Sequence, residues 1–262
     1  MTTDRIISKR EGAVGHITFN NPDRHNAMSL EMWRDGETAI REFCDAGDVR
    51  VIMLTGAGEK AFVAGADISK FGEERNSKAA VDEYNVAVKA FQTTLIAAPI
   101  PTIAKIGGYA IGGGLAIALC CDMRIASDDS RFAVPAAKLG LGYPAAGIER
   151  LMQIVGPSFA MEIFYTARQF DASEALTMGL INRVLPRAEL ETYCDDYAKR
   201  ISGNAPLTIR AVKTAVNENL KAPADRDVAL CAEQVAACFA SADYIEGRTA
   251  FMEKRPPEFT GK

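Results

Sequence analysis

A run of glycines, GGYAIGGG, occupies residues 107–114, and the apolar segment LAIALCC follows it directly. Five glycines within eight residues are costly, because glycine in a regular element loses roughly 0.5–1 kcal/mol of stability relative to alanine. The preceding segment TIAKI is typical of a buried strand, and the following segment is typical of a buried helix. The run therefore places bare backbone at the start of a helix.

A helix start leaves backbone N–H groups without partners and carries a partial positive charge. Glycines allow a ligand to approach these groups, so the natural guest is an anion or a carbonyl oxygen that becomes one. No Lys-Ser or Lys-Thr pair follows, which excludes a Walker A loop, and the spacing is not the G-x-G-x-x-G of dinucleotide sites. Close packing of helix on sheet, without a ligand, is the alternative explanation of the run.

A second cluster of small residues, AFVAGAD at 61–67, lies on a separate connection and also has a bare backbone. Two such turns can supply two N–H groups to one oxygen, which is the arrangement that stabilises a developing oxyanion. The presence of both clusters favours a binding site over packing alone.

Apolar patterning predicts alternating strands and helices in the first half of the chain and helices in the last third. The predicted strands are 5–10, 14–19, 49–56, 102–106, 123–127 and 131–135, with a short one near 181–186. The predicted helices are 30–47, 79–98, a helix beginning at 206, and 228–239, with a loop over 57–71. Ser29 is the expected N-cap of the first helix and Pro206 the expected first residue of another. This order predicts an α/β fold.

The composition narrows the class of protein. The 262 residues carry a net charge of -4 without a Lys/Arg-rich stripe, which argues against a nucleic-acid partner. The longest apolar stretch, 111–121, is too short to cross a bilayer, and the polar start has no signal core, so we expect no membrane association. Six cysteines without C-x-x-C and only two histidines argue for reduced thiols in a cytoplasmic protein and against a metal site.

Five stretches, in this order and spacing, resemble the crotonase superfamily, also called the enoyl-CoA hydratase/isomerase family. They are AFVAGADI, GGYAIGGGLAIALCCDMRIAS, RFAVPAAKLGLGYPAAGIERL, YTARQFDASEALTMGLINRVLP and AFMEKRPPEF. The resemblance implies a spiral of ββα units in residues 1–200 that binds an acyl-CoA thioester. It also implies a C-terminal helical region, residues 201–262, that covers the active site and assembles a homotrimer or a dimer of trimers.

The resemblance also assigns site residues. The oxyanion hole for the thioester carbonyl would be the backbone N–H groups of Ala66 and Gly113. The CoA moiety would be contacted by Arg24, Asn26, Ala27, Phe62, Ala64, Asp67, Ile68 and Lys254. Phe251 and Phe259 would lie with Lys254 near the mouth of the acyl site. Coenzyme A enters as part of the substrate, so the resemblance implies no separate cofactor.

The sequence departs from the family at the two positions where its hydratases carry catalytic glutamates. These positions are Ala116, two residues after the GGG, and Ala136, which follows the proline of RFAVP. Alanine transfers no proton, and each positioned acid or base typically contributes about 10²–10⁴ in rate. The departures argue against the standard hydratase mechanism.

Two other residues are candidate proton carriers. For Glu149, an ion pair with Arg150 or a solvated position is the simpler explanation. Tyr143 lies in KLGLGYPAAGI, which is similar to the corresponding stretch of the superfamily's methylmalonyl-CoA decarboxylases, and a packing role is its alternative. Those decarboxylases carry histidine where Ala66 stands and threonine where Val134 stands, so the similarity is incomplete.

The sequence leaves three functions open. The first is a hydratase or isomerase that uses an unrecognised acid or water. The second is an acyl-CoA decarboxylase that uses Tyr143, since loss of CO₂ leaves an enolate for the oxyanion hole and needs no general base. The third is an acyl-CoA binding protein without catalysis. All three share acyl-CoA binding, which is therefore the predicted function.

Overall fold

The computed structural model describes residues 5–67 and 77–262 of the chain. The strands are β1 (Ile6–Glu11), β2 (Val14–Phe19), β3 (Val51–Gly56), β4 (Ala61–Val63), β5 (Thr102–Ile106), β6 (Tyr109–Ile111), β7 (Met123–Ser127), β8 (Arg131–Ala133), β9 (Phe170–Asp171) and β10 (Arg183–Leu185). The helices are α1 (Leu30–Asp45), α3 (Lys78–Ala97), α4 (Gly113–Cys120), α5 (Ala145–Thr166), α6 (Ala172–Thr177), α7 (Leu190–Ser202), α8 (Pro206–Leu220), α9 (Val228–Ala240) and α10 (Ala242–Glu253).

The strands form two sheets. The larger sheet has the order β1-β2-β3-β5-β7-β10, and only its β1–β2 pair is antiparallel. The smaller sheet has the order β4-β6-β8-β9, and only its β8–β9 pair is antiparallel. Parallel pairs need long crossover connections, which here are helices that cover the sheets.

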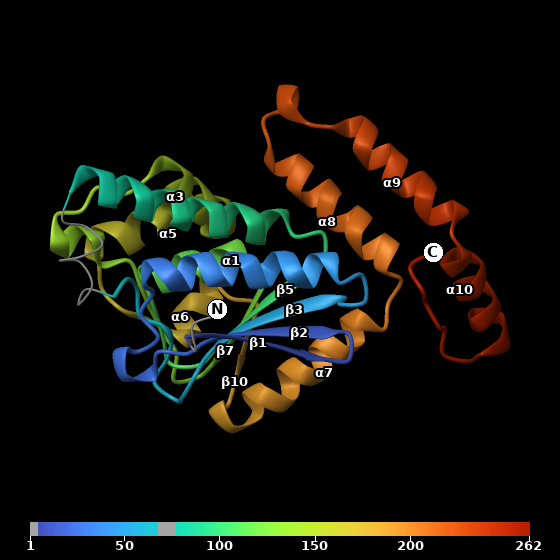
Figure 1. The fold of residues 1–262 in the computed structure, drawn as a ribbon, viewed down its shortest axis with the longest axis horizontal. Coiled ribbons are helices and arrows are strands. Elements are labelled where there is room, and N and C mark those ends of the chain that lie inside the picture. The colour runs from blue at the N-terminus through green and yellow to red at the C-terminus, as the bar shows by residue number, and fades with distance from the viewer. Residues whose placement is uncertain (1–4, 68–76) are drawn as a thin grey trace.

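One unit repeats three times along the chain: a strand of the larger sheet, a strand of the smaller sheet and a helix. The units are β3-β4-α3, β5-β6-α4 and β7-β8-α5. Each unit adds one parallel strand to each sheet, so the chain advances as a spiral (Figure 1). The predicted α/β class and the spiral of ββα units are confirmed.

The prediction of a loop over 57–71 is wrong at β4, and β6 within the glycine run was not predicted. Each of these strands has three residues, which is too short for an alternating pattern to be visible. The two strands pair in parallel, with Ala61 opposite Tyr109 and Val63 opposite Ala110. This pairing brings the two small-residue clusters of the sequence side by side.

The two faces of the larger sheet bury alternate residues of its strands. In β3, Ile52 and Leu54 belong to the main core, while Val51 and Met53 pack in a second cluster with Leu190 of α7. Figure 1 shows α1 and α3 on one side of this sheet and α7 on the other. The core is therefore large on the side that carries α4 and the smaller sheet.

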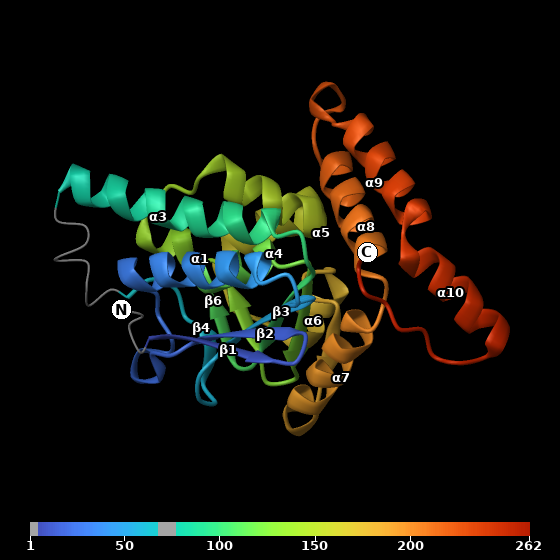
Figure 2. The same ribbon diagram turned by 45° about the vertical axis from the view of Figure 1, so that its right-hand side comes forward.

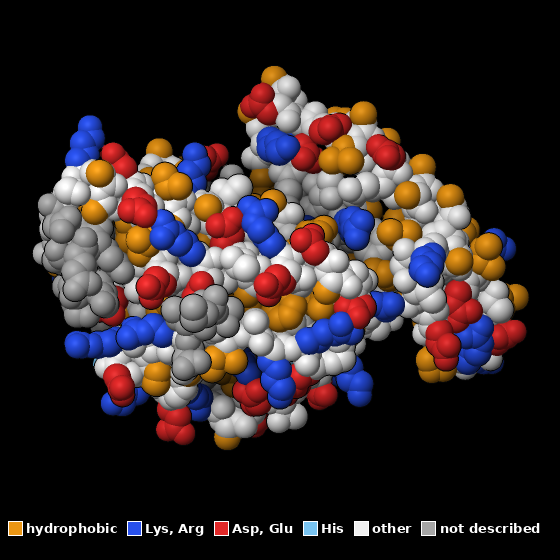
Figure 3. Space-filling view, viewed as in Figure 1, with side chains coloured by type: hydrophobic (Ala, Val, Ile, Leu, Met, Phe, Trp, Pro, Cys, Tyr) orange, Lys and Arg blue, Asp and Glu red, His pale blue; other side chains and the backbone are white. Residues whose placement is uncertain are grey.

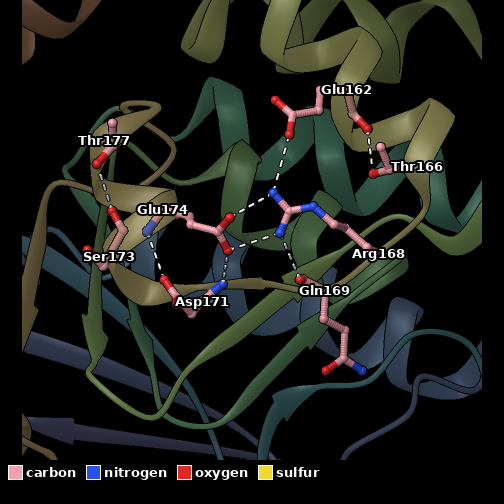
Figure 4. A network of polar contacts seen from close by, with 8 residues as sticks. All are labelled: Glu162, Thr166, Arg168, Gln169, Asp171, Ser173, Glu174 and Thr177. Atoms are coloured by element: carbon pink, nitrogen blue, oxygen red, sulfur yellow. Dashed lines mark hydrogen bonds and ion pairs between the residues drawn. The ribbon is translucent and has the colours of Figure 1, made fainter.

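A polar network joins the end of α5 to β9 and α6 (Figure 4). The Arg168 guanidinium lies 2.7 Å from a carboxylate oxygen of Glu174 and 3.3 Å from one of Glu162, and it stacks 3.8 Å from the centre of the Phe170 ring. Asp171 caps α6 by accepting from the Glu174 N–H, and Glu174 accepts from the Asp171 N–H in return. The network fixes the chain reversal that follows the third ββα unit.

Helices α8, α9 and α10 stand beside the spiral as an arm (Figures 1 and 2). Lys213 of α8 donates to Asp122 at 2.7 Å and to the carbonyl of Ile100 at 2.9 Å. Arg50, before β3, donates to the carbonyl of Ser202 at 3.0 Å. These contacts hold the base of the arm on the spiral, and the domain boundary at residue 200 stays a prediction.

The outer part of the arm is apolar. Helix α9 contains no buried residue, and hydrophobic side chains follow it in the space-filling view (Figure 3). Among the described residues, no single helix has the length and apolar composition of a membrane span. The α9–α10 pair meets those criteria only when the two helices are taken together across a 52° bend.

The closest backbone approach along α4 generates a stability prediction. A Cβ at Gly114 would lie 1.9 Å from the carbonyl oxygen of Val63, whereas a Cβ at Gly142 would meet no atom within 4 Å. We expect Gly114→Ala to lower the free energy of unfolding by at least about 2 kcal/mol, because overpacking forces the helix away from β4. Gly142→Ala is the matched control. Equal denaturant midpoints for the two variants would contradict this prediction.

Candidate active site

The two small-residue clusters meet at the first turn of α4. A Cβ at Gly113 would lie 3.7 Å from both the Cα and the carbonyl carbon of Gly65, so the two backbones are separated by about the space of one methyl group. Gly65 has a φ of +100°, a conformation that side chains disfavour, which explains why the turn needs glycine. The peptide between Gly65 and Ala66 therefore lies against the start of the helix.

Hydrogen bonding around Ala66 leaves its N–H group directed away from its neighbouring strand. Met28 donates to the Gly65 carbonyl at 2.8 Å, and Asp67 donates to the Met28 carbonyl at 2.9 Å. This is a parallel bridge between Met28 and Ala66, in which the N–H of Ala66 points to the opposite side. Among the described residues, that N–H has no acceptor.

Gly113 supplies a second free donor. It is the first residue of α4, so its N–H has no partner within the helix. Gly112, which precedes it, donates to Ala133 and accepts from Ala116. In residues 5–67 and 77–262, no acceptor faces the Gly113 N–H. Its position at a helix start adds a partial positive charge.

Two arginines lie at the opposite end of α4. Arg150 donates through Nε to the carbonyl of Leu119 at 2.9 Å, and Arg124 donates through Nη1 to the carbonyl of Cys121 at 2.9 Å. Cations at a helix C-terminus complement its dipole. Of the two alternatives to a proton carrier given for Glu149, an ion pair with Arg150 is not found among the described residues, and the Glu149 side chain is exposed. The solvated position is the explanation that the structure supports.

Ala116 and Ala136 lie on either side of the α4 start. Ala116 is half-buried one turn after Gly113, and Ala136 is buried just after Pro135. A Cβ at Gly112 would lie 4.0 Å from Cδ of Pro135, so the segment of Ala136 flanks the glycines. The two positions therefore give the site an apolar wall without a carboxylate.

Tyr143 packs against α5 and lies near Cys120, the last residue of α4. Its ring lies 4.8 Å from the ring of Phe164, edge to face, and a Cβ at Gly147 would lie 2.7 Å from it. Burial raises the pKa of the Tyr143 phenol, and the proximity of Cys120 raises it further, so the hydroxyl keeps its proton at neutral pH. Burial also raises the pKa of Cys120 to about 12, which leaves that thiol protonated. Tyr143 is thus a packed residue that still carries a proton.

The loop expected to contact CoA divides into exposed and structural residues. Arg24 is exposed, and Ala27 is buried. Asn26 is fully buried, and its side chain accepts from the N–H of Asn21 and donates to the carbonyls of Ala57 and Ala61 at 2.9 and 2.7 Å. Asn26 therefore fixes the loop, and its side chain has no free group for a ligand.

The second CoA segment divides in the same way. Ala64 is half-buried and donates to the carbonyl of His25 at 3.0 Å, which joins the two segments. Asp67 is buried with a further polar partner of its own. Phe62 is fully buried, with its ring 5.5 Å from the Phe19 ring, so it belongs to the core. Ile68 lies outside the described residues.

The expected mouth residues lie near the end of the chain. Lys254 ends α10, Phe251 is 83% exposed, and Phe259 packs over Gly247. Lys254 and Phe251 belong to α10 and its end, whereas the carbonyl of Phe259 accepts from Arg50 of the spiral at 2.5 Å. Their placement near the mouth of the acyl site stays a prediction.

An apolar cavity of about 680 Å³ lies within the arm, and not at the α4 start. Its walls come from α8, α9 and α10, and include Ala211, Val235, Tyr244 and Phe251. The cavity holds none of the free donors described above. We therefore place the candidate active site at Ala66 and Gly113.

The sequence did not predict the buried residues that pack behind this site. Trp33, Tyr84 and Met28 come from α1, α3 and the loop before α1, and they form contacts across more than fifty positions of the chain. The apolar period of α1 predicted only that Trp33 is buried. No local signal pairs it with Tyr84.

Comparison with known proteins agrees with this architecture. The family model for enoyl-CoA hydratase/isomerase matches residues 9–262. A short-chain-enoyl-CoA hydratase of Clostridium acetobutylicum is 35% identical over 258 residues, 98% of each chain. A crotonyl-CoA hydratase of Syntrophomonas wolfei is 35% identical over 262 residues, 100% of each chain. The crystal structure of an enoyl-CoA hydratase/carnithine racemase from Magnetospirillum magneticum has a TM-score of 0.92 at 35% identity, covering 99% of this chain and 97% of that one.

The match covers nearly the whole chain in sequence and in structure. The protein is an α/β enzyme-family member with a spiral of ββα units. It belongs to the enoyl-CoA hydratase/isomerase family, within the crotonase superfamily.

The division of the Arg24–Ala27 loop into exposed and structural residues can be tested by measuring the stability of variants. We expect Asn26→Ala to lower the free energy of unfolding by about 2–4 kcal/mol, because three backbone groups lose their partner and two of these hydrogen bonds are buried. The exposed Arg24→Ala should change it by no more than about 0.5 kcal/mol. Urea unfolding of both variants measures this, and an unchanged midpoint for Asn26→Ala would count against a structural role.

Proposed function

We propose that the chain binds acyl-CoA thioesters with the carbonyl oxygen between the N–H groups of Ala66 and Gly113. The observation that carries the proposal is the closeness of the Gly65 turn to the start of α4, where both donors lack an acceptor among the described residues. Arg24, Ala27, Ala64 and Asp67 are the proposed neighbours of the CoA moiety.

The two donors suit an enolate better than a ground-state carbonyl. Charge grows on the thioester oxygen as the α-carbon gains carbanion character, and fixed N–H dipoles stabilise that charge without reorganising. Losing one such donor costs on the order of 10²–10³ in rate. The α4 start adds its dipole, and Arg124 and Arg150 complement its other end.

Proton transfer in this site differs from that of a two-glutamate hydratase. Ala116 and Ala136 line the wall where those carboxylates would stand, and neither moves a proton. Glu149 is exposed. The proposed activity is therefore enolate chemistry in which water or Tyr143 supplies the proton.

Decarboxylation of a malonyl-type thioester is the second candidate. The bond to the carboxylate carbon breaks, its electron pair passes to the thioester as an enolate, and CO₂ leaves. The α-carbon then takes a proton from the Tyr143 hydroxyl, and the resulting phenolate regains a proton from solvent. The observation that favours this candidate is a half-buried Tyr143 that carries a phenolic proton, together with Ala116 and Ala136, which place no carboxylate where it would repel a malonyl-type substrate.

The functional test is turnover of crotonyl-, methylmalonyl- and 3-enoyl-CoA, with thioester loss followed separately. We expect crotonyl-CoA hydration to be far below the diffusional range of kcat/KM, about 10⁸ M⁻¹s⁻¹, because two proton carriers are missing. If methylmalonyl-CoA is decarboxylated, Tyr143→Phe should lower kcat by about 10²-fold or more. Binding of the panel without any turnover would indicate the non-catalytic alternative.

A double variant, Ala116→Glu with Ala136→Glu, is the matched control for this test. It should raise crotonyl-CoA hydration above the wild-type value, unless burial raises both carboxyl pKa values enough to keep them neutral. Hydration by the wild type at about 10⁷–10⁸ M⁻¹s⁻¹ would refute the argument from the missing carboxylates.

We further propose that the arm assembles a homotrimer or a dimer of trimers. Helix α9 buries nothing within the chain, and Phe239 and Val235 are 62% and 50% exposed beside the apolar cavity. An exposed apolar surface of this extent is typical of an interface. A cytoplasmic location fits six free cysteines.

Light scattering at micromolar concentration should give three or six chain masses. Phe239→Lys should lower the observed mass, because it places a charge on the apolar face of the arm. Val86→Lys is the control, since Val86 is 67% exposed on α3 outside the arm. A wild-type monomer would refute the proposed assembly.

A further inference from the structure

Trp33 is the only tryptophan of the chain, and its side chain lies near the start of α4. The residue is 2% exposed, and a Cβ at Gly113 would lie 3.7 Å from its Cζ2 atom, the same distance as from Gly65. The edge of the indole ring thus lies beside the point where the two donor segments meet. The Phe91 ring, 5.2 Å away and edge to face, supports it from α3.

A chain of hydrogen bonds continues from this ring to the other donor segment. The indole N–H donates to the Tyr84 hydroxyl at 2.9 Å, and that hydroxyl donates to the Met28 carbonyl at 3.5 Å. The same carbonyl accepts from the N–H of Asp67, and the Met28 N–H donates to Gly65. The residues on both sides of Ala66 are therefore held by Met28, whose carbonyl also accepts from Tyr84.

The two donors thus share one support although they lie on separate connections. Trp33 comes from α1 and Tyr84 from α3, and both side chains are buried. Packing of Trp33 fixes the position of Gly113. The hydrogen bond from the Tyr84 hydroxyl to the Met28 carbonyl fixes the position of the Gly65–Asp67 segment. A shift of about 1 Å in a positioning group can cost 10²-fold in rate.

We infer that Trp33 and Tyr84 are positioning residues that set the separation of the Ala66 and Gly113 N–H groups. The inference rests on the proposed function, because it concerns the same two donors. Neither side chain touches the substrate, so their effect is on recognition of the thioester oxygen and not on the CoA moiety.

The test compares two ligands that differ at the oxyanion. Acetoacetyl-CoA presents a thioester that enolises, and free CoA has no carbonyl at that position. Tyr84→Phe removes only the hydroxyl and keeps the ring. It should weaken acetoacetyl-CoA binding by about 5- to 10-fold and change the Kd of CoA by less than about twofold, because the hydrogen bonds lost with the hydroxyl, to Trp33 and to Met28, both act on the donor segments. Tyr193→Phe, on α7 across the larger sheet, is the matched control.

Calorimetry gives both dissociation constants for each variant, and thermal unfolding reports folding. Selective loss of acetoacetyl-CoA binding in a folded Tyr84→Phe protein supports the inference. Equal weakening of both ligands, or no change in either, overturns it. A wild-type protein that binds acetoacetyl-CoA no better than CoA overturns the proposed function, and this inference with it.

The single tryptophan provides a second measurement that needs no variant. Its emission should change when acetoacetyl-CoA fills the site, because the ring lies against Gly113. Free CoA should leave the emission unchanged. An emission spectrum that responds to neither ligand, while calorimetry detects acetoacetyl-CoA binding, contradicts a coupling between Trp33 and the donors.

Discussion

The close approach of α4 to β4 is the constraint on which the site depends. At 1.9 Å from a would-be Cβ of Gly114, the Val63 carbonyl leaves no room for a side chain. This close approach places α4 directly on the smaller sheet, and it brings Gly113 close to Gly65. Glycines lower the intrinsic stability of the helix, but no other residue permits this close approach of α4 to β4.

The helix that results has two chemically different ends. Among the described residues its first N–H has no acceptor, whereas arginines 124 and 150 satisfy carbonyls at and just beyond its last turn. Ala116 follows this first turn, and Ala136 lies just after Pro135, which is close to Gly112. In the proposed function, this end of the helix stabilises an enolate oxygen, and the two alanines supply no proton.

The sequence predicted those parts of the fold that local chemistry decides. Ser29 caps α1 and Pro206 begins α8 as expected, because caps and proline act on their own helix. The two small-residue clusters lie side by side through the pairing of β4 with β6, and the site proposed there stays a prediction. The three-residue strands carry no period, and the Trp33–Tyr84 contact spans 51 positions, so neither was predictable from local pattern. The outward direction of the arm is likewise a tertiary property.

The central claim concerns one oxygen and two backbone donors. A crystal structure with acetoacetyl-CoA bound tests it most directly. The account predicts a thioester oxygen within about 2.7–3.1 Å of the nitrogens of both Ala66 and Gly113. A bound ligand whose thioester oxygen lies far from both nitrogens, or in the cavity of the arm, would contradict it.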